Sequence, residues 1–281
     1  SLKQRGPDAT GVYTNGNIGL GHSRLSIIDT SEAGNQPFCD KEEKYFLVFN
    51  GEFYNYKDYR DELIDDGYQF KSESDTEVLL YLLIKYGSKA IEKVNGCFAF
   101  AFYNLEKNEI LLARDRMGIN PLMYYLDNEK VIFSSELKGI LEFDIPRELD
   151  YQAMFTYFQL NYIPNNQCIL KKIIKLEPGH FSVINSKGIK TERYYKIPVP
   201  DNSSSFISYE DAKYKLHNLL DQSVERRLIA DVPVGCFLSG GIDSSVITSL
   251  AAGHTKNLNT FSIGFTDDPF FDETKYAALV A

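Results

Sequence analysis

The sequence predicts two fold classes in succession: an α+β arrangement of stacked antiparallel sheets between helices, and then an α/β parallel sheet. Residues 1–150 are dense in short β-branched or aromatic runs broken by Gly, Asn and Asp, and only a few helical stretches interrupt them. Residues 232–265 contain a strand, a glycine loop, a helix and a second strand, the pattern of a βαβ unit. The 281 residues, 43% of them hydrophobic, suffice for two packed domains.

The elements of the first domain follow in order along the chain. Strands are expected in the runs IGLGHSRLSII, KYFLVFNGEFYNY, CFAFAFYN, EILLARDR and LMYYLDNEKVIFSS. The run YKDYRDELIDDG predicts a helix with Tyr59, Leu63 and Ile64 on one face. The run TEVLLYLLIKYG predicts a second helix, capped by Ser74 or Asp75 and ended by a glycine. The helix YQAMFTYFQL and the hairpin GHFSVINSKGIKTERYY complete this domain.

Two prolines and a serine cluster in IPVPDNSSSFIS predict a linker at 199–207, between a first domain at 1–198 and a second at 208–281. Ser208 is expected to cap a helix in which Ala212, Leu216, Leu219 and other apolar residues recur at helical spacing. Two parallel strands need cover on both faces, so we expect this second domain to be truncated and the chain to be part of a longer protein.

The composition argues against several classes of function. The net charge is −9, and no Lys/Arg-rich run stands out, so a nucleic-acid partner is not expected. The longest apolar runs are far below the roughly 18 residues of a membrane span, and no secretory leader is visible. Cys39, Cys97, Cys168 and Cys236 are widely spaced, which favours reduced structural cysteines in a cytoplasmic protein.

The stretch LSGGIDSS, which starts at Leu238, carries the chemistry of a phosphate site. Gly240 and Gly241 let the backbone approach a ligand, and the helix that begins near Asp243 offers free N–H groups to an anion. Ser239 and Ser244 add hydroxyl donors, and Asp243 beside such a bed indicates a bridging Mg²⁺ ion. A Gly-Gly turn capped by an aspartate would explain these residues alone equally well.

In its strand–loop–helix context, this stretch resembles the pyrophosphate loop of the N-type ATP pyrophosphatases, which cleave ATP between the α and β phosphates to adenylate a substrate. The resemblance implies that the main chain of Leu238 and Ile263 holds adenine, and that Ser239, Gly240, Gly241, Asp243 and Ser244 bind the phosphates.

Seven further motifs come in order: QRGPD, GHSRLSIID, FNGEFYNY, SESDTE, NGCFAFAFYN, LLARDRMGINPLMYY and FSSELKGIL. Together they resemble the glutaminase domain of glutamine-hydrolysing asparagine synthetases, a class II amidotransferase of the N-terminal-nucleophile type. The resemblance covers nearly the whole chain. It implies an N-terminal-nucleophile sandwich followed by a truncated, Rossmann-like ATP pyrophosphatase domain.

The resemblance also implies roles for residues that bind glutamine. Arg24 matches the clamp for the α-carboxylate, a task that suits a planar guanidinium, and Ile27 and Ile28 belong to the same segment. Asp75, with Glu52 close by, matches the acceptor for the α-ammonium group.

The Asn50 side chain and the Gly51 backbone N–H match the family's oxyanion hole, which stabilises the tetrahedral intermediate. Each residue has an ordinary alternative. Asn50-Gly51 is also a hairpin-turn dipeptide, Asp75 is also a good helix cap, and Arg24 could be a surface ion-pair partner. The order and number of the motifs favour the functional interpretation.

The family's nucleophile is a cysteine at the mature N-terminus, whose own α-amine serves as the base. The sequence starts at Ser1, and none of its four cysteines lies in a matching motif, so the role is assigned to none of them. We therefore expect the sequence to be incomplete at both ends.

The expected reaction is asparagine synthesis from glutamine, aspartate and ATP, with Mg²⁺ on the departing pyrophosphate. One alternative is a related enzyme that amidates another carboxylate, such as a sugar acid, or that closes a lactam ring. Phosphoribosyl or hexosamine-phosphate amidotransferases share the first domain type but not the loop, and a degenerate scaffold would be expected to lose Asp243 or Arg24.

A homodimer is expected. His22 and Cys236 are interpreted as packing residues, and Asp272 in the run DDPFFDETKYA is a candidate ligand at the rim of the ATP site.

Overall fold

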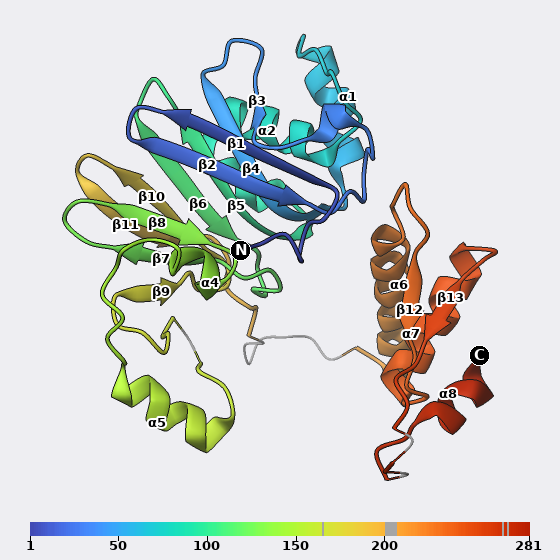
Figure 1. Cartoon of the computed structure of the whole chain (residues 1–281). Helices are drawn as coiled ribbons and strands as arrows, with labels where there is room; N and C mark the ends of the chain where they lie inside the picture. The colour runs from blue at the N-terminus through green and yellow to red at the C-terminus, as the bar shows by residue number, and fades with distance from the viewer. Residues whose placement is uncertain (165, 200–206, 266, 269) are drawn as a thin grey trace. The chain divides into compact units, whose positions relative to one another are not determined.

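A computed structural model describes residues 1–164, 166–199, 207–265, 267–268 and 270–281. The chain divides into two compact units, Ser1–Pro198 and Val199–Ala281, which are described separately (Figure 1). Most of the predicted linker at 199–207 lies outside the described residues. Within the described ranges, every helix is too short or too polar to cross a lipid bilayer.

A six-stranded antiparallel sheet forms the centre of the first unit, with the strand order β11-β10-β6-β5-β4-β3. Its strands are β3 (Phe38–Cys39), β4 (Tyr45–Phe53), β5 (Gly96–Asn104), β6 (Glu109–Arg114), β10 (His180–Asn185) and β11 (Gly188–Arg193). The longest ladder joins β4 to β5, where Tyr45 pairs with Asn104 and Phe53 with Gly96. Asn50 and Gly51 therefore lie inside a strand, and the hairpin-turn alternative is wrong.

Two smaller antiparallel sheets lie against one face of the central sheet. One is the pair β1 (Ala9–Asn15) and β2 (Ile18–Arg24); the other has the order β8-β7-β9, with β7 (Met123–Leu126), β8 (Val131–Ser134) and β9 (Ile173–Lys175). A buried cluster joins the layers and includes Leu20 of β2, Val48 of β4, Leu112 of β6 and Tyr124 of β7. Burial of these side chains is the main force that holds the sheets together.

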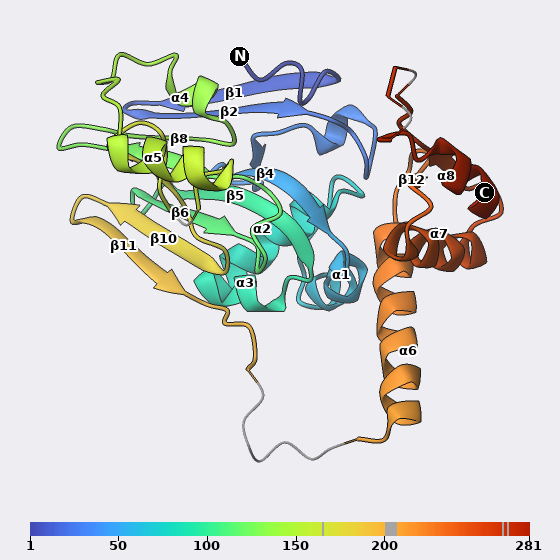
Figure 2. The ribbon, with the colours of Figure 1, turned by 90° about the horizontal axis from the view of Figure 1, so that it is seen from below.

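Helices α1 (Tyr56–Asp65), α2 (Asp75–Tyr86) and α3 (Ala90–Lys93) lie on the other face of the central sheet (Figure 2). The side chain of Ser74 caps α2 by accepting the N–H of Thr76 at 3.2 Å, and Gly87 ends the helix at φ 59°. Leu63 is fully buried as predicted, whereas Ile64 is 49% exposed. The prediction for Ile64 was wrong because α1 buries only a narrow stripe, formed by Tyr56 and Leu63.

Helix α4 (Leu137–Ile140) covers the outer face of the β8-β7-β9 sheet, where Tyr125, Ile132, Ile140 and Ile173 form a second buried cluster. The first unit thus consists of two antiparallel layers with helices on both outer sides, which confirms the predicted α+β class.

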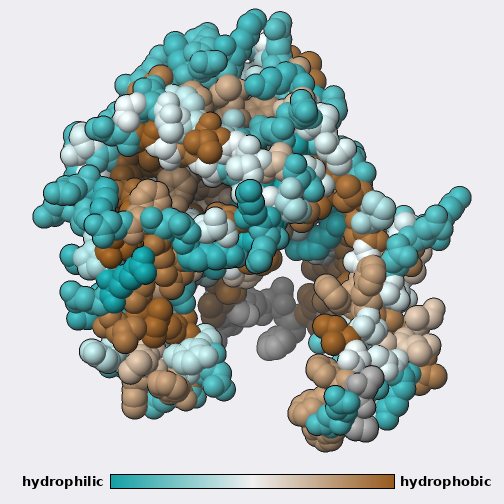
Figure 3. Space-filling model, in the orientation of Figure 1, coloured by the Kyte–Doolittle hydropathy of each residue, from teal (hydrophilic) through white to brown (hydrophobic). Residues whose placement is uncertain are grey.

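Helix α5 (Tyr151–Leu160) buries only Ala153, and apolar side chains gather over it in Figure 3. Tyr151, Phe155 and Phe158 are more than half exposed on this helix.

The second unit contains α6 (Tyr209–Arg227), β12 (Gly235–Phe237), α7 (Ile242–His254), β13 (Asn259–Phe261) and α8 (Thr274–Val280). Strands β12 and β13 are parallel, and Cys236 pairs with Thr260, which confirms the predicted βαβ unit. Ser208 caps α6 as expected, since its hydroxyl accepts the N–H of Asp211 at 3.1 Å. The apolar stripe of α6 is only partly covered within this unit: Val224 is buried but Leu219 is exposed.

Candidate functional site

A pocket of about 370 Å³ opens in the first unit between β2, β4, β5 and the start of α2. Small-molecule pockets commonly have volumes of roughly 300–1,000 Å³, so this one suits a molecule of the size of an amino acid. All seven residues predicted to bind glutamine line it: Arg24, Ile27, Ile28, Asn50, Gly51, Glu52 and Asp75. The structure therefore brings together residues that are up to 51 positions apart in the sequence.

The two acidic residues of the pocket are held at the junction of β4 and α2. Asp75 is the first residue of α2, and its carboxylate accepts the N–H of Phe53 at 2.9 Å. Burial raises the pKa of Asp75 to about 6, although its hydrogen bonds oppose this change. Burial, together with the charge of Asp75, raises the pKa of Glu52 to about 8. The pair is therefore costly to ionise fully unless a cation lies beside it.

The backbone at Gly51 leaves no room for a side chain. A Cβ atom there would lie 2.2 Å from the carbonyl oxygen of Cys97 on the neighbouring strand, so only glycine fits. The Asn50 side chain donates a long hydrogen bond of 3.4 Å to the hydroxyl of Ser135. Both groups are partly exposed and line the pocket, where an amide N–H and a backbone N–H could stabilise an oxyanion.

Arg24 is 5% exposed, so the alternative of a surface ion-pair partner is wrong. Its Nη1 atom donates to the carbonyl of Ser31 at 2.8 Å and to Asn35 Oδ1 at 3.1 Å. Its Nη2 atom donates to the carbonyls of Ile28, at 3.1 Å, and Asp29. In this arrangement the guanidinium shapes the loop beside the pocket, and a bidentate grip on a carboxylate would require some of these bonds to be exchanged.

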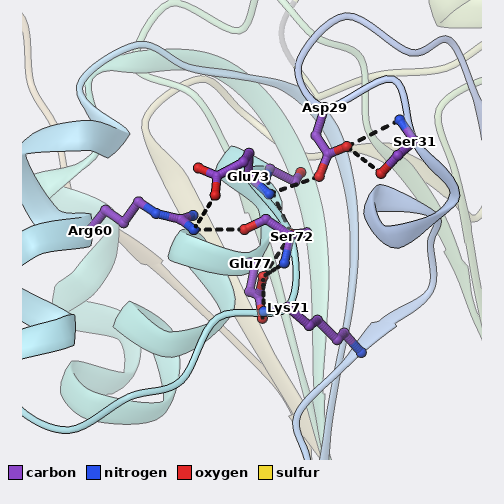
Figure 4. Close-up of polar contacts among 8 residues, drawn as sticks. Asp29, Ser31, Arg60, Lys71, Ser72, Glu73 and Glu77 are labelled. Atoms are coloured by element: carbon purple, nitrogen blue, oxygen red, sulfur yellow. Dashed lines mark hydrogen bonds and ion pairs between the residues drawn. The ribbon is translucent and has the colours of Figure 1, made fainter.

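Asp29 joins this loop to the one that precedes α2 (Figure 4). Its Oδ2 accepts the N–H of Glu73 at 2.8 Å, and its Oδ1 accepts the N–H of Ser31 at 3.1 Å. Burial acts to raise the pKa of Asp29, but the bonds from Ser31 and Glu73 and the charge of Arg24 hold it below its ordinary value. Asp29 is therefore a charged bridge between the segment of Arg24 and the segment of Asp75.

Glu77 anchors the loop that precedes α2, as Figure 4 shows. This residue is fully buried in α2, and its carboxylate accepts the N–H of Lys71 at 3.0 Å and both the N–H and the hydroxyl of Ser72, at 2.8 and 2.6 Å. Arg60 donates to the Ser72 carbonyl at 2.8 Å from the other side. These bonds fix the entry to α2 and hence the position of Asp75.

His22 also lines the pocket, and its Nε2 lies 3.1 Å from the carbonyl oxygen of Phe49. A carbonyl can only accept, so Nε2 carries the proton and donates. Burial lowers the pKa of His22 to about 4, with a further contribution from the charge of Arg24. The imidazole is therefore neutral at physiological pH.

Several pocket residues had no role in the sequence analysis. Gln36 is buried, accepts the N–H of Phe49 at 2.6 Å and donates to the Thr76 hydroxyl at 3.3 Å. Asn120 lines the pocket and contacts the backbone of both central strands. Its motif, RDRMGIN, was recognised, but only the fold shows where the amide lies.

In the second unit, the predicted phosphate residues lie at the start of α7. The Ser239 and Ser244 hydroxyls are 3.0 Å apart, and the Ser244 hydroxyl donates to the carbonyl of Gly241 at 3.1 Å. Gly241 is the N-cap of α7 and offers no side chain to the free N–H groups of the first turn. Gly240 has φ +80°, and a Cβ atom there would lie 2.4 Å from the carbonyl carbon of Tyr276 in α8. This helix start therefore fits an anion.

Leu238 and Ile263 follow the carboxyl ends of the two parallel strands, where open α/β sheets bind their ligands. Leu238 is buried; its N–H donates to the Phe261 carbonyl at 2.8 Å, and its carbonyl accepts the Ser262 hydroxyl at 2.6 Å. Ile263 is exposed.

Asp243 is exposed in the first turn of α7. Within the described ranges, no three His, Cys, Asp or Glu side chains converge to hold a metal. Mg²⁺ usually takes only one or two carboxylates as ligands and fills its other positions with water and substrate phosphates. A single aspartate beside a candidate phosphate-binding site therefore fits this ion.

The carboxylate of Asp272 accepts the N–H and hydroxyl of Thr274, at 3.1 and 2.8 Å, at the start of α8. These bonds hold the pKa of Asp272 below its ordinary value.

Comparisons with known proteins give a family match in each of the two units. The family model described as a glutamine amidotransferase domain matches residues 1–195, and the one described as asparagine synthase matches residues 215–281. Asparagine synthetase (glutamine-hydrolyzing) 1 of Bacillus subtilis is 39% identical over 96% of this chain and 42% of its own length. Asparagine synthetase (glutamine-hydrolyzing) 3 of the same organism is 36% identical over 98% of this chain and 46% of its own length.

A third relative, the amidase chyE of Penicillium rubens, is 33% identical over 99% of this chain and 43% of its own length. The chain thus spans less than half the length of each of these relatives. The amidotransferase match alone covers more than half of the chain, and the chain therefore belongs to the family of glutamine amidotransferase domains.

Proposed function

We propose that the protein to which this chain belongs makes asparagine, with glutamine as the nitrogen donor and ATP as the source of energy. The observation that carries this proposal is that one chain contains two sites. One is an amino-acid-sized pocket lined by all seven residues predicted to bind glutamine, and the other is an anion site in a βαβ unit. Each site alone occurs in several enzyme classes, whereas their combination points to an enzyme that uses glutamine nitrogen and ATP to amidate a carboxylate.

In the first unit, glutamine and water give glutamate and ammonia. Asp75 and Glu52 accept the α-ammonium group, and Arg24 with Ile27 and Ile28 forms the wall beside the α-carboxylate. The side-chain amide carbon is attacked by the family's N-terminal cysteine, a role that we assign to none of the four cysteines present here. The Asn50 amide and the Gly51 N–H stabilise the negative oxygen of the tetrahedral intermediate.

In the second unit, the β-carboxylate of aspartate attacks the α-phosphate of ATP, and pyrophosphate leaves. The N–H groups at the start of α7 and the hydroxyls of Ser239 and Ser244 hold the phosphates, while the main chain of Leu238 and Ile263 contacts adenine. Mg²⁺, when bound near Asp243, neutralises part of the phosphate charge. Ammonia then displaces AMP from the aspartyl adenylate and gives asparagine.

The test measures pyrophosphate release by the full-length native protein with ATP, Mg²⁺ and aspartate, first with ammonia and then with glutamine. Release that depends on aspartate and proceeds with both nitrogen sources is the expected result. Release with ammonia alone would mean that the glutaminase site is inactive. If aspartate supports no release with either source, the asparagine assignment is wrong.

One observation favours a second candidate, an enzyme that amidates a different carboxylate. A relative aligned over 99% of this chain is not named an asparagine synthetase, so proteins similar to this chain over both units need not share one acceptor. The same assay separates the two candidates, because a protein of this second kind would hydrolyse glutamine but leave ATP intact when aspartate is the only acceptor supplied. Other acceptors, such as sugar acids, would then be added in turn.

A further inference from the structure

The side chain of Asn120 lies at the back of the proposed oxyanion hole and bonds to both strands that form it. Its Nδ2 atom donates to the carbonyl oxygen of Asn50 at 2.8 Å and to the carbonyl oxygen of Cys97 at 3.1 Å. Asn50 belongs to β4 and Cys97 to β5. One amide group thus uses both of its N–H bonds to hold two neighbouring strands at the pocket.

The bond to Asn50 has a geometric consequence for Gly51. The carbonyl of Asn50 and the N–H of Gly51 belong to the same peptide unit, which is planar and trans, so the two groups point in opposite directions. A hydrogen bond that fixes the direction of the Asn50 carbonyl therefore also fixes the direction of the Gly51 N–H. Glycine has the freest backbone of all residues, and without such a bond this peptide unit could rotate more easily.

Asn120 is itself held firmly. Its backbone N–H donates to Asp115 Oδ2 at 3.0 Å, and its backbone carbonyl accepts a hydrogen bond from Arg114 Nε at 2.8 Å. Asp115 is 1% exposed and also accepts the N–H groups of Met117 and Ile119, each at 3.0 Å. Hydrogen bonds therefore fix the turn after β6, and through Asn120 this turn holds the pocket ends of β4 and β5 in place.

We propose that Asn120 is a positioning residue for glutamine hydrolysis, which aims the Gly51 N–H at the developing oxyanion. This inference rests on the proposed glutaminase function of the pocket. An oxyanion donor acts mainly on the transition state, so its misalignment lowers kcat and leaves glutamine binding nearly unchanged.

The decisive variant is Asn120→Asp in the full-length protein, because aspartate has the same shape but no N–H to donate. We expect kcat for glutamine hydrolysis to fall about tenfold to a hundredfold, since misplaced catalytic groups cost on this order. KM for glutamine should stay within about twofold of the wild-type value. Pyrophosphate release with ammonia should be unchanged.

The pH profile gives a readout that a general loss of packing would not move. Burial beside two carbonyl oxygens should raise the pKa of the new carboxyl group, and its protonated form regains one donor. The activity of the variant relative to wild type should therefore rise as the pH falls from about 8 to about 6.

Asn55→Asp is the matched control. The Asn55 amide also donates to a backbone carbonyl across two segments, that of Lys93 at 3.2 Å, and its oxygen accepts the N–H of Asn95 at 2.8 Å, but it does not line the pocket. This control should keep the wild-type kcat. An equal loss of kcat in both variants, or a normal kcat in Asn120→Asp, would overturn the inference.

A second measurement separates failure of this inference from failure of the proposed function. If the wild-type protein does not hydrolyse glutamine, the proposed function fails whatever Asn120 does. The amide resonance of Gly51 in a ¹⁵N-labelled sample should still shift, and its hydrogen exchange should accelerate, in Asn120→Asp compared with wild type. An unmoved Gly51 resonance would show that Asn120 does not control this peptide unit.

Discussion

The carboxylate of Asp75 accepts the backbone N–H of Phe53 at 2.9 Å, and this bond ties the first turn of α2 to the strand residue that follows Glu52. Two acidic side chains are thereby held in one largely buried corner of the pocket, where the pKa of Glu52 is raised to about 8 and that of Asp75 to about 6. A bound α-ammonium group would favour the charged form of both.

This pair predicts how glutamine binding depends on pH. Below pH 8 the Glu52 carboxyl is mostly protonated, and a cation binds better once the proton leaves. KM for glutamine should therefore fall as the pH rises from about 6 to about 8, by at most about tenfold per unit for one released proton. Initial rates at several pH values measure this dependence.

The Glu52→Gln variant should lose most of this pH dependence, whereas Glu129→Gln, at an exposed site in the turn between β7 and β8, should retain it. A KM that does not change with pH in the wild-type protein would mean that the pair is not the ammonium acceptor.

Local patterns were enough to predict the elements of this pocket but not all of their faces. The cap of Ser74 and the end at Gly87 follow from short-range backbone chemistry, and the structure has both. Ile64 was assigned to the buried face of α1, but the packing of α1 against α2 buries Leu63 and leaves Ile64 exposed. Helix α1 has only ten residues, and their periodicity does not show which edge of its apolar stripe packs against α2.

Contacts between distant segments account for what the sequence did not reveal. Asn120 meets Asn50 and Cys97 across 70 and 23 positions, and no periodicity or spacing encodes such a meeting. Arg24 was expected to face a ligand carboxylate, yet four acceptors in the segment 28–35 surround its terminal nitrogens. Residue types in a motif indicate which chemistry is available, while the fold decides how many donors are already occupied.

The Asp29 bridge predicts a selective loss of glutamine binding in Asp29→Asn. The amide cannot accept both the Glu73 N–H and the Ser31 N–H in the present geometry, so the two loops should separate. Loss of one charge-assisted bond costs about 1.5–3 kcal/mol, and we expect KM for glutamine to rise at least about tenfold with a smaller change in kcat. Steady-state kinetics measure the two constants separately.

Asp127→Asn is the matched control for this prediction. Asp127 also accepts two backbone N–H groups, those of Glu129 and Lys130 at 2.9 and 2.8 Å, but in a turn that does not line the pocket. Similar kinetic losses in both variants would point to general destabilisation instead of loop positioning.

Gly240→Ala should impair the second site and leave the first intact. The new methyl group would lie 2.4 Å from the Tyr276 carbonyl carbon at a φ of +80°, so the loop or α8 must move. Backbone strain of about 1–3 kcal/mol is typical of such substitutions, and we expect pyrophosphate release with ammonia to fall more than about tenfold. Glutamine hydrolysis, measured as glutamate formed, should persist.

Gly253→Ala is the control, because a Cβ atom at this position of α7 meets nothing within 4 Å. Alanine is the better helix former, so this variant should keep its activity and be slightly more stable. Equal pyrophosphate release by Gly240→Ala and the wild type would show that the close approach at Gly240 is not needed by the phosphate site.

His22 predicts a loss of stability in acid. In the folded chain the pKa of His22 is lowered to about 4, whereas an unfolded chain has a histidine near 6.5. Between these values the unfolded state binds a proton that the folded state does not, so the free energy of unfolding falls as the pH falls from about 6.5 to about 4. At pH 5 this effect amounts to about 1–2 kcal/mol.

Urea denaturation at pH 7.5 and pH 5 would measure this loss of stability. The His22→Gln variant should lose less stability than wild type over this interval. His217→Gln, at an exposed position of α6, should behave like wild type. If His22→Gln and wild type lose the same stability between the two pH values, the imidazole is not buried in its neutral form.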